Sequence, residues 1–220
     1  CRVEGILMSV CHKDRNSNIY NNVKNHGIPI VFFDRKVEGI DASTVRIDDY
    51  LMAFFMVERM IRSGCRKIVH LAGPDHISNG YDRHRGYREA LEKFSIPYDK
   101  RYVIKGGLSA EEGAAAVEKF MSQGLDFDGL FGFTETSTLG AKSSLQKMNY
   151  RIPEDVSLCC ISGTTLCTLV HPTVTAVEQP VIEMATLSCR LLLGQIADPN
   201  AATESVMLRG NIVERESFRT

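Results

Sequence analysis

The sequence lacks the features that mark several classes of protein. No apolar run approaches the roughly 18 residues that a membrane-spanning helix requires. The seven cysteines include no C-x-x-C pair, and no two histidines have the spacing of a metal-binding helix face. There is no G-x-G-x-x-G, no P-loop and no G-x-S-x-G motif. We therefore expect no membrane span, no metal, no cofactor and no catalytic site.

The charge is nearly balanced, with 26 Lys and Arg residues against 27 Asp and Glu residues. Phosphate binding needs an excess of cations on one face, so the composition argues against a large nucleic-acid surface, though not against a small anion pocket. The chain of 220 residues is long enough for one large domain or two small ones. An odd, scattered set of cysteines and no visible signal peptide indicate a reducing compartment, and we expect a cytoplasmic protein.

One short stretch nevertheless concentrates cations. DRHRGYREAL, residues 82–91, carries three arginines and a histidine within seven residues. Three hypotheses compete for it: a nucleic-acid patch, a clamp for a ligand, or the solvated start of an ordinary helix.

Short apolar runs alternate with amphipathic stretches along the chain. The runs expected to form strands are residues 5–10, 28–34, 44–48, 67–73, 102–104, 127–133, 156–162, 174–179 and a closing pair within 205–215. Helices are expected over 49–63, 82–94, 109–122, 137–148 and 180–196, with a polar helical stretch ending before Gly27. Ser109 and Glu112 have the spacing of a capping box. Continuous apolar strands that alternate with helices indicate parallel sheets covered on both faces.

In such sheets, ligands bind beyond the carboxyl ends of the strands. The loops expected at that edge begin at Ser9, Asp34, Gly73, Thr134, Ser162 and Gln179.

Several stretches together resemble a known family. They are IPIVFFDR (28–35), SGCRKIVHLAG (63–73), DRHRGYREAL (82–91), YRIPEDVSL (150–158), HPTVTAVEQP (171–180) and NIVERESF (211–218). In this order and spacing they resemble the effector-binding domain of the LacI/GalR family of bacterial transcription regulators, whose fold is shared with periplasmic sugar-binding proteins. The resemblance covers nearly the whole chain, and IPEDVSL, HPTVT and VERES are its specific pieces.

The resemblance implies an α/β fold of two doubly wound parallel-sheet subdomains, of periplasmic-binding-protein type I, with the effector in the cleft between them. The first subdomain would be residues 1–48 plus 180–208, and the second 49–179 plus 209–220. The chain opens at Cys1 without a methionine. We therefore expect that the first subdomain is incomplete at its N-terminus, and that a DNA-binding helix-turn-helix headpiece lies upstream.

The resemblance also assigns ligand contacts. The arginine directly before Gly-aromatic is expected to hydrogen-bond the effector, and in this chain it is Arg85. A planar guanidinium suits vicinal hydroxyls or a carboxylate, because two bonds can form side by side. Arg83, His84 and Arg88 would lie on other helix faces, where we expect solvated or ion-paired side chains.

The other ligand positions implied by the resemblance are Asp34, Arg35, Thr134, Glu135, Ser162, Gln179 and Leu108. Asp34 and Arg35 could equally form a local salt bridge, and Gln179 a hinge hydrogen bond. Ser162, Thr134 and Leu108 stand where the family usually has Asp, Asn and an aromatic residue. The loss of a carboxylate at Ser162 leads to the hypothesis of an anionic effector, a sugar acid or sugar phosphate, with a degenerate pocket as the rival.

The function implied is a regulator that responds to a sugar or sugar derivative, acts as a homodimer, and binds operator DNA through its headpiece. The alternative is a periplasmic solute-binding protein of a sugar transporter. An α/β enzyme is the weakest of the three hypotheses, because no nucleophile, metal or cofactor motif stands out.

Overall fold

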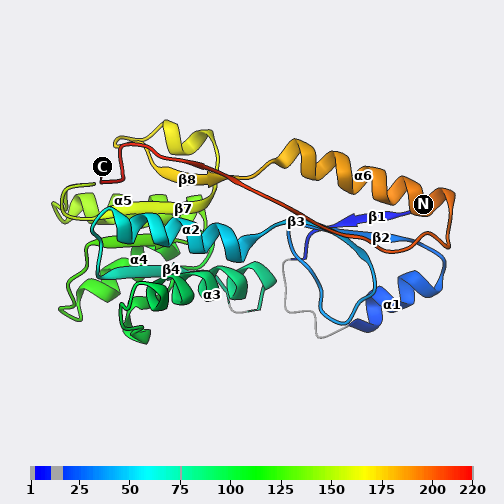
Figure 1. The fold of residues 1–220 in the computed structure, drawn as a ribbon, viewed down its shortest axis with the longest axis horizontal. Coiled ribbons are helices and arrows are strands. Elements are labelled where there is room, and N and C mark those ends of the chain that lie inside the picture. The colour runs from blue at the N-terminus through cyan, green and yellow to red at the C-terminus, as the bar shows by residue number, and fades with distance from the viewer. Residues whose placement is uncertain (1–2, 11–16, 75, 220) are drawn as a thin grey trace. The chain divides into compact units, whose positions relative to one another are not determined.

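The computed structural model describes residues 3–10, 17–74 and 76–219, which form two compact units (Figure 1). The first unit comprises residues 1–48, 76–79 and 180–209 in their described part. The second comprises residues 49–75, 80–179 and 210–220, likewise in their described part.

The first unit is built on a parallel sheet of four strands in the order β1-β2-β3-β9. The strands are β1 (Ile6–Met8), β2 (Ile30–Phe33), β3 (Ser43–Ile47) and β9 (Ser205–Leu208). Helices α1 (Ser17–Asn25) and α6 (Val181–Ala197) lie on opposite faces of this sheet (Figure 1). Tyr20 of α1 packs edge-on against Phe32, with ring centroids 5.4 Å apart, and so attaches the helix to the sheet.

The second unit is built on a sheet of six strands in the order β10-β8-β7-β6-β4-β5. Its strands are β4 (Ile68–Ala72), β5 (Val103–Lys105), β6 (Gly129–Gly132), β7 (Ser157–Gly163), β8 (Thr175–Glu178) and β10 (Asn211–Val213). Only β10 at the edge runs antiparallel to its neighbour in this sheet. The carboxyl ends of the other strands therefore meet at one edge.

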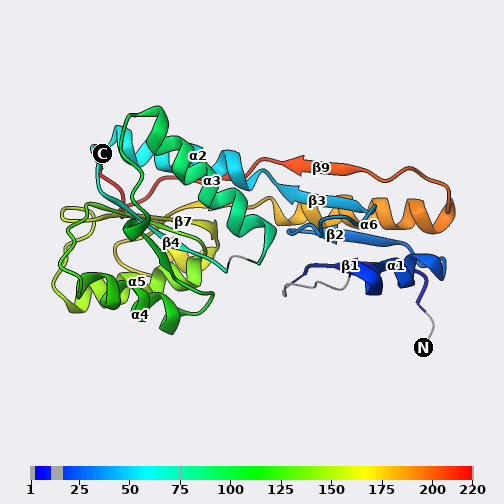
Figure 2. The same cartoon turned by 90° about the horizontal axis from the view of Figure 1, so that it is seen from below.

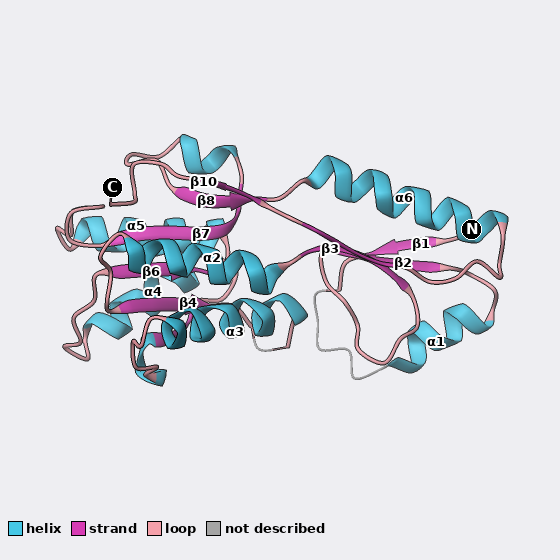
Figure 3. Ribbon diagram, in the orientation of Figure 1, coloured by secondary structure: helices cyan, strands magenta, loops and turns pink. Residues whose placement is uncertain are grey.

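Helices cover both faces of the second sheet (Figures 2 and 3). One face carries α2 (Asp49–Arg62) and α3 (Ser78–Lys93), and the other carries α4 (Ala110–Met121) and α5 (Glu135–Lys147). Two short 3-10 helices, η1 (Lys100–Tyr102) and η2 (Thr165–Thr168), lie in the connections. No helix of the described residues is long and apolar enough to span a bilayer.

The predicted α/β class with doubly wound parallel sheets is confirmed, and so is the capping box of Ser109 and Glu112. The predicted start of α3 at residue 82 is wrong, because the helix begins at Ser78. Serine, asparagine and glycine at its start are poor helix formers. Tertiary packing at Asn79, which is 3% exposed, overrides the weak propensity.

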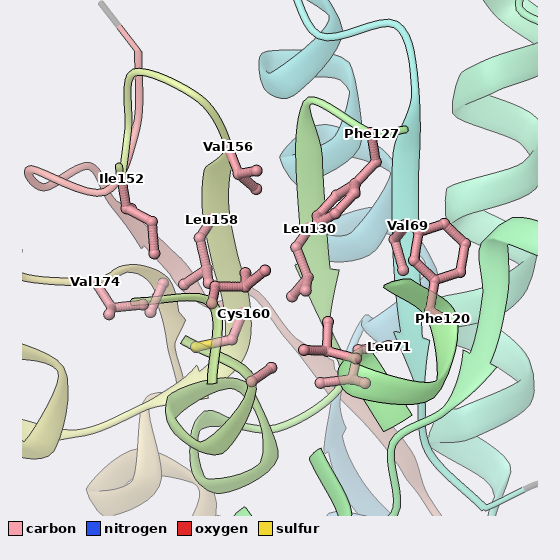
Figure 4. Packing of buried hydrophobic residues seen from close by; sticks show 14 of the residues in the cluster. Val69, Leu71, Phe120, Phe127, Leu130, Ile152, Val156, Leu158, Cys160 and Val174 are labelled. Carbon is pink, nitrogen blue, oxygen red and sulfur yellow. The ribbon is translucent and has the colours of Figure 1, made fainter. Parts of the chain in front are cut away.

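One hydrophobic cluster of the second unit lies between its sheet and α4 and α5 (Figure 4). Leu71, Leu130 and Leu158 come from three adjacent strands and are fully buried together with Phe120 of α4. The neighbours Cys159 and Cys160 are buried as predicted. Burial raises the pKa of the Cys159 thiol, and a hydrogen bond with Cys167 together with burial raises that of Cys160.

Two glycines allow α4 and α5 to pack closely. A Cβ atom at Gly113 would lie 1.9 Å from the backbone oxygen of Ser137, and one at Gly140 would lie 1.9 Å from that of Ala110. Real Cβ atoms do not approach oxygen so closely, so any side chain at either position would force the helices apart.

We expect Gly113→Ala to lower the free energy of unfolding by about 1–3 kcal/mol, as overpacking of a core does. Gly194→Ala in α6 is the matched control, since its Cβ would meet nothing within 4 Å. The control should raise stability by up to ~1 kcal/mol, because alanine is the better helix former. Urea denaturation of both variants measures this, and equal effects would refute the packing argument.

His70 in β4 is a buried, hydrogen-bonded core residue, as predicted. Its Nδ1 lies 3.1 Å from the backbone oxygen of Phe131, and its ring stacks on Phe131 and Tyr87 with centroids 4.9 and 5.2 Å away. Burial lowers its pKa from 6.5 to about 3. The folded chain therefore keeps this imidazole neutral at pH values where the unfolded chain protonates it.

This difference predicts a pH dependence of stability. Below the unfolded pKa of 6.5 the unfolded state binds one proton more at His70, so stability falls as the pH falls toward about 3, by roughly 1.4 kcal/mol per pH unit. Urea denaturation at pH 7 and pH 5 should show a smaller fall for His70→Gln than for the unaltered chain. A pH profile of His70→Gln parallel to that of the unaltered chain would contradict the assignment.

Candidate functional site

The central side chain at the carboxyl edge of the second sheet is Arg83 of α3, which is 1% exposed. Its Nε donates to Oδ1 of Asp49 at 2.7 Å, and its Nη1 donates to the backbone oxygen of Phe133. Its Nη2 donates to Oγ of Ser162 at 3.3 Å. The guanidinium carbon also lies 4.5 Å from the centre of the Phe133 ring. The cation is thus enclosed by a carboxylate, two neutral oxygens and an aromatic face.

The partners of Arg83 come from three different elements. Asp49 is the first residue of α2 and is fully buried, and the N-terminal dipole of the helix favours its negative charge. Phe133 directly follows β6, and Ser162 lies near the end of β7. The parallel topology brings these ends together, which is why residues far apart in sequence meet at one guanidinium.

Ser162 occupies an irregular position in β7. The pairing with β8 shifts between Ile161 and Gly163, and Ser162 between them has a φ of +66°. A serine in this left-handed region is uncommon, and strain of this kind concentrates at binding sites. The bulge turns the Ser162 hydroxyl toward Arg83 and toward Gln179, whose Nε2 donates to it at 2.7 Å.

Hydrogen-bonding capacity remains in this cluster. The Ser162 oxygen accepts from both Arg83 and Gln179, so its own proton is left to donate. The Gln179 amide oxygen has no hydrogen-bond partner among the residues that the structure describes, and it can accept. The pair offers a donor and an acceptor side by side, which suits a hydroxyl group of a ligand.

Two of the predicted ligand residues have local partners. The Glu135 carboxylate accepts from the backbone N–H groups of Thr164 and Cys167 at 2.7 and 3.0 Å, and from the Thr164 hydroxyl at 2.7 Å. Thr134 caps the N-terminus of α5 and accepts from the N–H of Ser137. Glu135 therefore holds the connection after β7, and Thr134 begins the helix.

Arg85 lies on a different face of α3 from Arg83. Its side chain is 40% exposed, its guanidinium carbon lies 4.3 Å from the centre of the Tyr50 ring, and Asp82 lies 3.7 Å away. The neighbouring Gly86 packs against the backbone of Tyr50, so this part of α3 contacts α2. A ligand role for Arg85 stays a prediction.

The expectation of a solvated Arg83 is wrong, because its position on α3 places it in the interior. The alternative expectation, an ion pair, is met, and the partner is the fully buried carboxylate of Asp49. Arg88 is exposed and lies 3.5 Å from Glu92, as expected of a surface pair.

The remaining predicted residues lie apart from this cluster in sequence. Asp34 directly follows β2 with a φ of +63°, and its carboxylate lies 3.3 Å from Nε of Arg35. Arg35 also donates to the backbone oxygen of Val10 at 3.0 Å. Leu108 is 42% exposed, just before the cap of α4. No group of His, Cys, Asp and Glu side chains within the described residues has a metal-binding arrangement.

Residues 57–218 match the model of the periplasmic binding protein-like domain. The chain belongs to this family. The predicted resemblance to the effector-binding domain of LacI-type regulators is confirmed by the relatives that match over this region.

One relative is the HTH-type transcriptional regulator CelR of Thermobifida fusca, 29% identical over 217 residues. The match covers 98% of this chain and 63% of CelR, so the chain spans less than two thirds of that protein. A solved transcriptional regulator CelR–cellobiose complex superposes with a TM-score of 0.91 at 28% identity, covering 98% of this chain and 66% of that one. A LacI-family regulator from Enterococcus faecium with bound ribose has a TM-score of 0.89 at 23% identity, covering 98% and 80%, and shows the same fold.

Helical periodicity was the signal for Arg83. Tyr87, Ala90 and Leu91 of α3 are all buried, whereas Tyr81 nearer its start is exposed. Four residues before Tyr87 on the same face stands Arg83, whereas Arg85 is two residues away and faces elsewhere. The motif before Gly86 predicts a ligand role for Arg85 and gives no signal for the buried Arg83.

Arg83→Leu should lower the free energy of unfolding by about 3–5 kcal/mol, because it leaves the buried carboxylate of Asp49 without its cation. The matched control Arg85→Leu removes a half-exposed arginine two positions away and should cost at most ~1 kcal/mol. Urea denaturation gives both values.

The double variant Arg83→Leu with Asp49→Asn separates the charge from the packing. It should recover part of the loss, because no unpaired charge remains in the interior. A double variant no more stable than Arg83→Leu alone would show that the ion pair does not cause the loss.

Proposed function

We propose that this chain is the effector-binding part of a ligand-responsive bacterial transcription regulator. The observation that carries the proposal is the cluster of Arg83, Ser162 and Gln179 at the carboxyl edge of the second sheet, with hydrogen-bonding groups left to bind a ligand. Family membership and the similarity to a regulator solved with cellobiose support it.

We propose an uncharged sugar as the effector. Each arginine considered for the site has a carboxylate nearby: Arg83 has Asp49, Arg85 has Asp82, and Arg35 has Asp34. The positive charges of these arginines are therefore balanced, which favours an uncharged ligand over a sugar acid or sugar phosphate. Serine, glutamine and guanidinium groups suit the donors and acceptors of a hydroxylated ring.

The other predicted contacts with the effector stay proposals with less support. They are Asp34, Arg35, Thr134, Glu135, Arg85 and Leu108. Glu135 is the weakest of them, because three hydrogen bonds within the protein already occupy its carboxylate. Thr134 is engaged in a helix cap. An effector would reach these groups only by displacing the contacts that hold the local backbone.

The proposed mechanism is a shift of population. The sugar binds one conformation of the regulator more tightly than another, and the difference changes the affinity for operator DNA, typically by ~1–3 kcal/mol. As part of the proposal, the DNA is bound by a helix-turn-helix unit upstream of these residues, in a cytoplasmic homodimer without catalytic activity. A transporter's solute-binding protein is less well supported, because the relatives are transcription regulators.

The experiment that tests the site is isothermal titration calorimetry with cellobiose, ribose, glucuronate and glucose 6-phosphate. Ser162→Gly should weaken the binding of the preferred uncharged sugar by on the order of tenfold, the value of one or two lost hydrogen bonds. Glycine accepts the left-handed backbone at this position, so the fold should persist. Gln179→Leu should weaken binding similarly.

Arg88→Ala is the control, because Arg88 is exposed on the same helix and lies 3.5 Å from Glu92, and it should bind the sugar as the unaltered chain does. Loss of binding in Arg85→Ala with full binding in Ser162→Gly would move the site to the other face of α3. Tighter binding of glucuronate or glucose 6-phosphate than of any neutral sugar would refute the uncharged effector.

A further inference from the structure

A cavity lies in the second unit at the end of the sheet opposite the candidate site, by the amino ends of β4 and β5. Its volume is about 530 Å³, which is within the range of small-molecule sites. Apolar side chains make up much of the lining, among them Leu91, Phe94, Ile96 and Tyr102. Nothing in the proposed effector site accounts for this cavity, because its walls come from residues 66–68 and 87–102.

Three cations and one carboxylate also line the cavity, and two of the cations are neutralised. Lys67 lies 2.5 Å from the carboxylate of Asp126, which raises the pKa of the lysine. Arg101 donates to Asp99 through Nε at 2.8 Å and through Nη2 at 2.5 Å, which lowers the pKa of Asp99. These two pairs contribute no net charge to the cavity.

Arg66 is the third cation and has no carboxylate in an ion pair with its guanidinium among the described residues. Its Nη1 donates to the backbone oxygens of Ile61 and Cys65 at 2.7 and 2.8 Å. The nearby carboxylate of Asp128 accepts from the backbone N–H groups of Arg66 and Lys67 instead. The two carbonyl groups therefore fix the orientation of the guanidinium, while its Nε and Nη2 groups are left to bind an anion.

We propose that this cavity binds an organic anion with an apolar body, of the class of aryl- or alkylcarboxylates. The carboxylate lies on the guanidinium of Arg66, where a charge-assisted pair of hydrogen bonds can form. The apolar body covers Leu91, Phe94 and Ile96. Tyr87 and Leu91 of the lining share one face of α3 with Arg83, so this ligand contacts the same helix that carries the buried arginine.

The test uses 3-phenylpropionate as the probe and its uncharged isostere 3-phenylpropanamide as the matched ligand control. Isothermal titration calorimetry on the 220-residue chain should show that the acid binds on the order of tenfold more tightly than the amide, since the amide cannot form the charged pair. Because both ligands are compared on the unaltered chain, this result does not depend on whether a variant folds.

Variants then locate the site. Arg66→Gln should weaken the binding of the acid on the order of tenfold and leave the affinity for the amide unchanged. Arg151→Gln, at an exposed arginine of the same unit paired with Asp155, should bind both ligands as the unaltered chain does. Equal affinities for acid and amide, no binding of the acid, or an equal loss in both variants would each overturn the proposal. None of these measurements requires a sugar to bind.

Discussion

The buried ion pair of Arg83 and Asp49 is the constraint on which the carboxyl edge of the second sheet depends. A guanidinium that is 1% exposed is tolerated only when its donors are satisfied, and here a carboxylate, a backbone oxygen and a serine hydroxyl satisfy them. Each partner is fixed by a different element. One side chain therefore links α3 to the ends of β6 and β7 and to the start of α2.

The same side chain connects two places where the chain passes from one unit to the other. Asp49 is the first residue of the second unit after Asp48, and Gln179 is its last residue before Pro180. Arg83 binds Asp49 directly and Gln179 through Ser162. A ligand that altered the hydrogen bonds of Ser162 would thus act on backbone that continues into the first unit. This continuity gives the proposed population shift a physical route.

The architecture was predictable from the sequence because the strands of a buried parallel sheet are short continuous apolar runs, and such runs are visible in the sequence. The start of α3 does not follow from propensity, since Ser78 and Asn79 are poor helix formers and the burial of Asn79 exists only in the folded chain. At the site, Ser162 and Gln179 followed from the resemblance, but Arg83 did not. Its partners come from residues 49, 133 and 162, and that proximity exists only once the sheet has formed.

The absence of a carboxylate at Ser162 has a different meaning once Asp49 is taken into account. Along the sequence, with Arg85 and possibly Arg35 retained, it led to the hypothesis of an anionic effector, and that hypothesis gave no role to Arg83. In the structure, the charge of Arg83 is already balanced by a fully buried aspartate. A serine can then accept from the arginine and still donate its own proton. What distinguishes a ligand-binding group from a structural one is its remaining hydrogen-bonding capacity, and Glu135 has less of it than Ser162 and Gln179, because its carboxylate already accepts three hydrogen bonds.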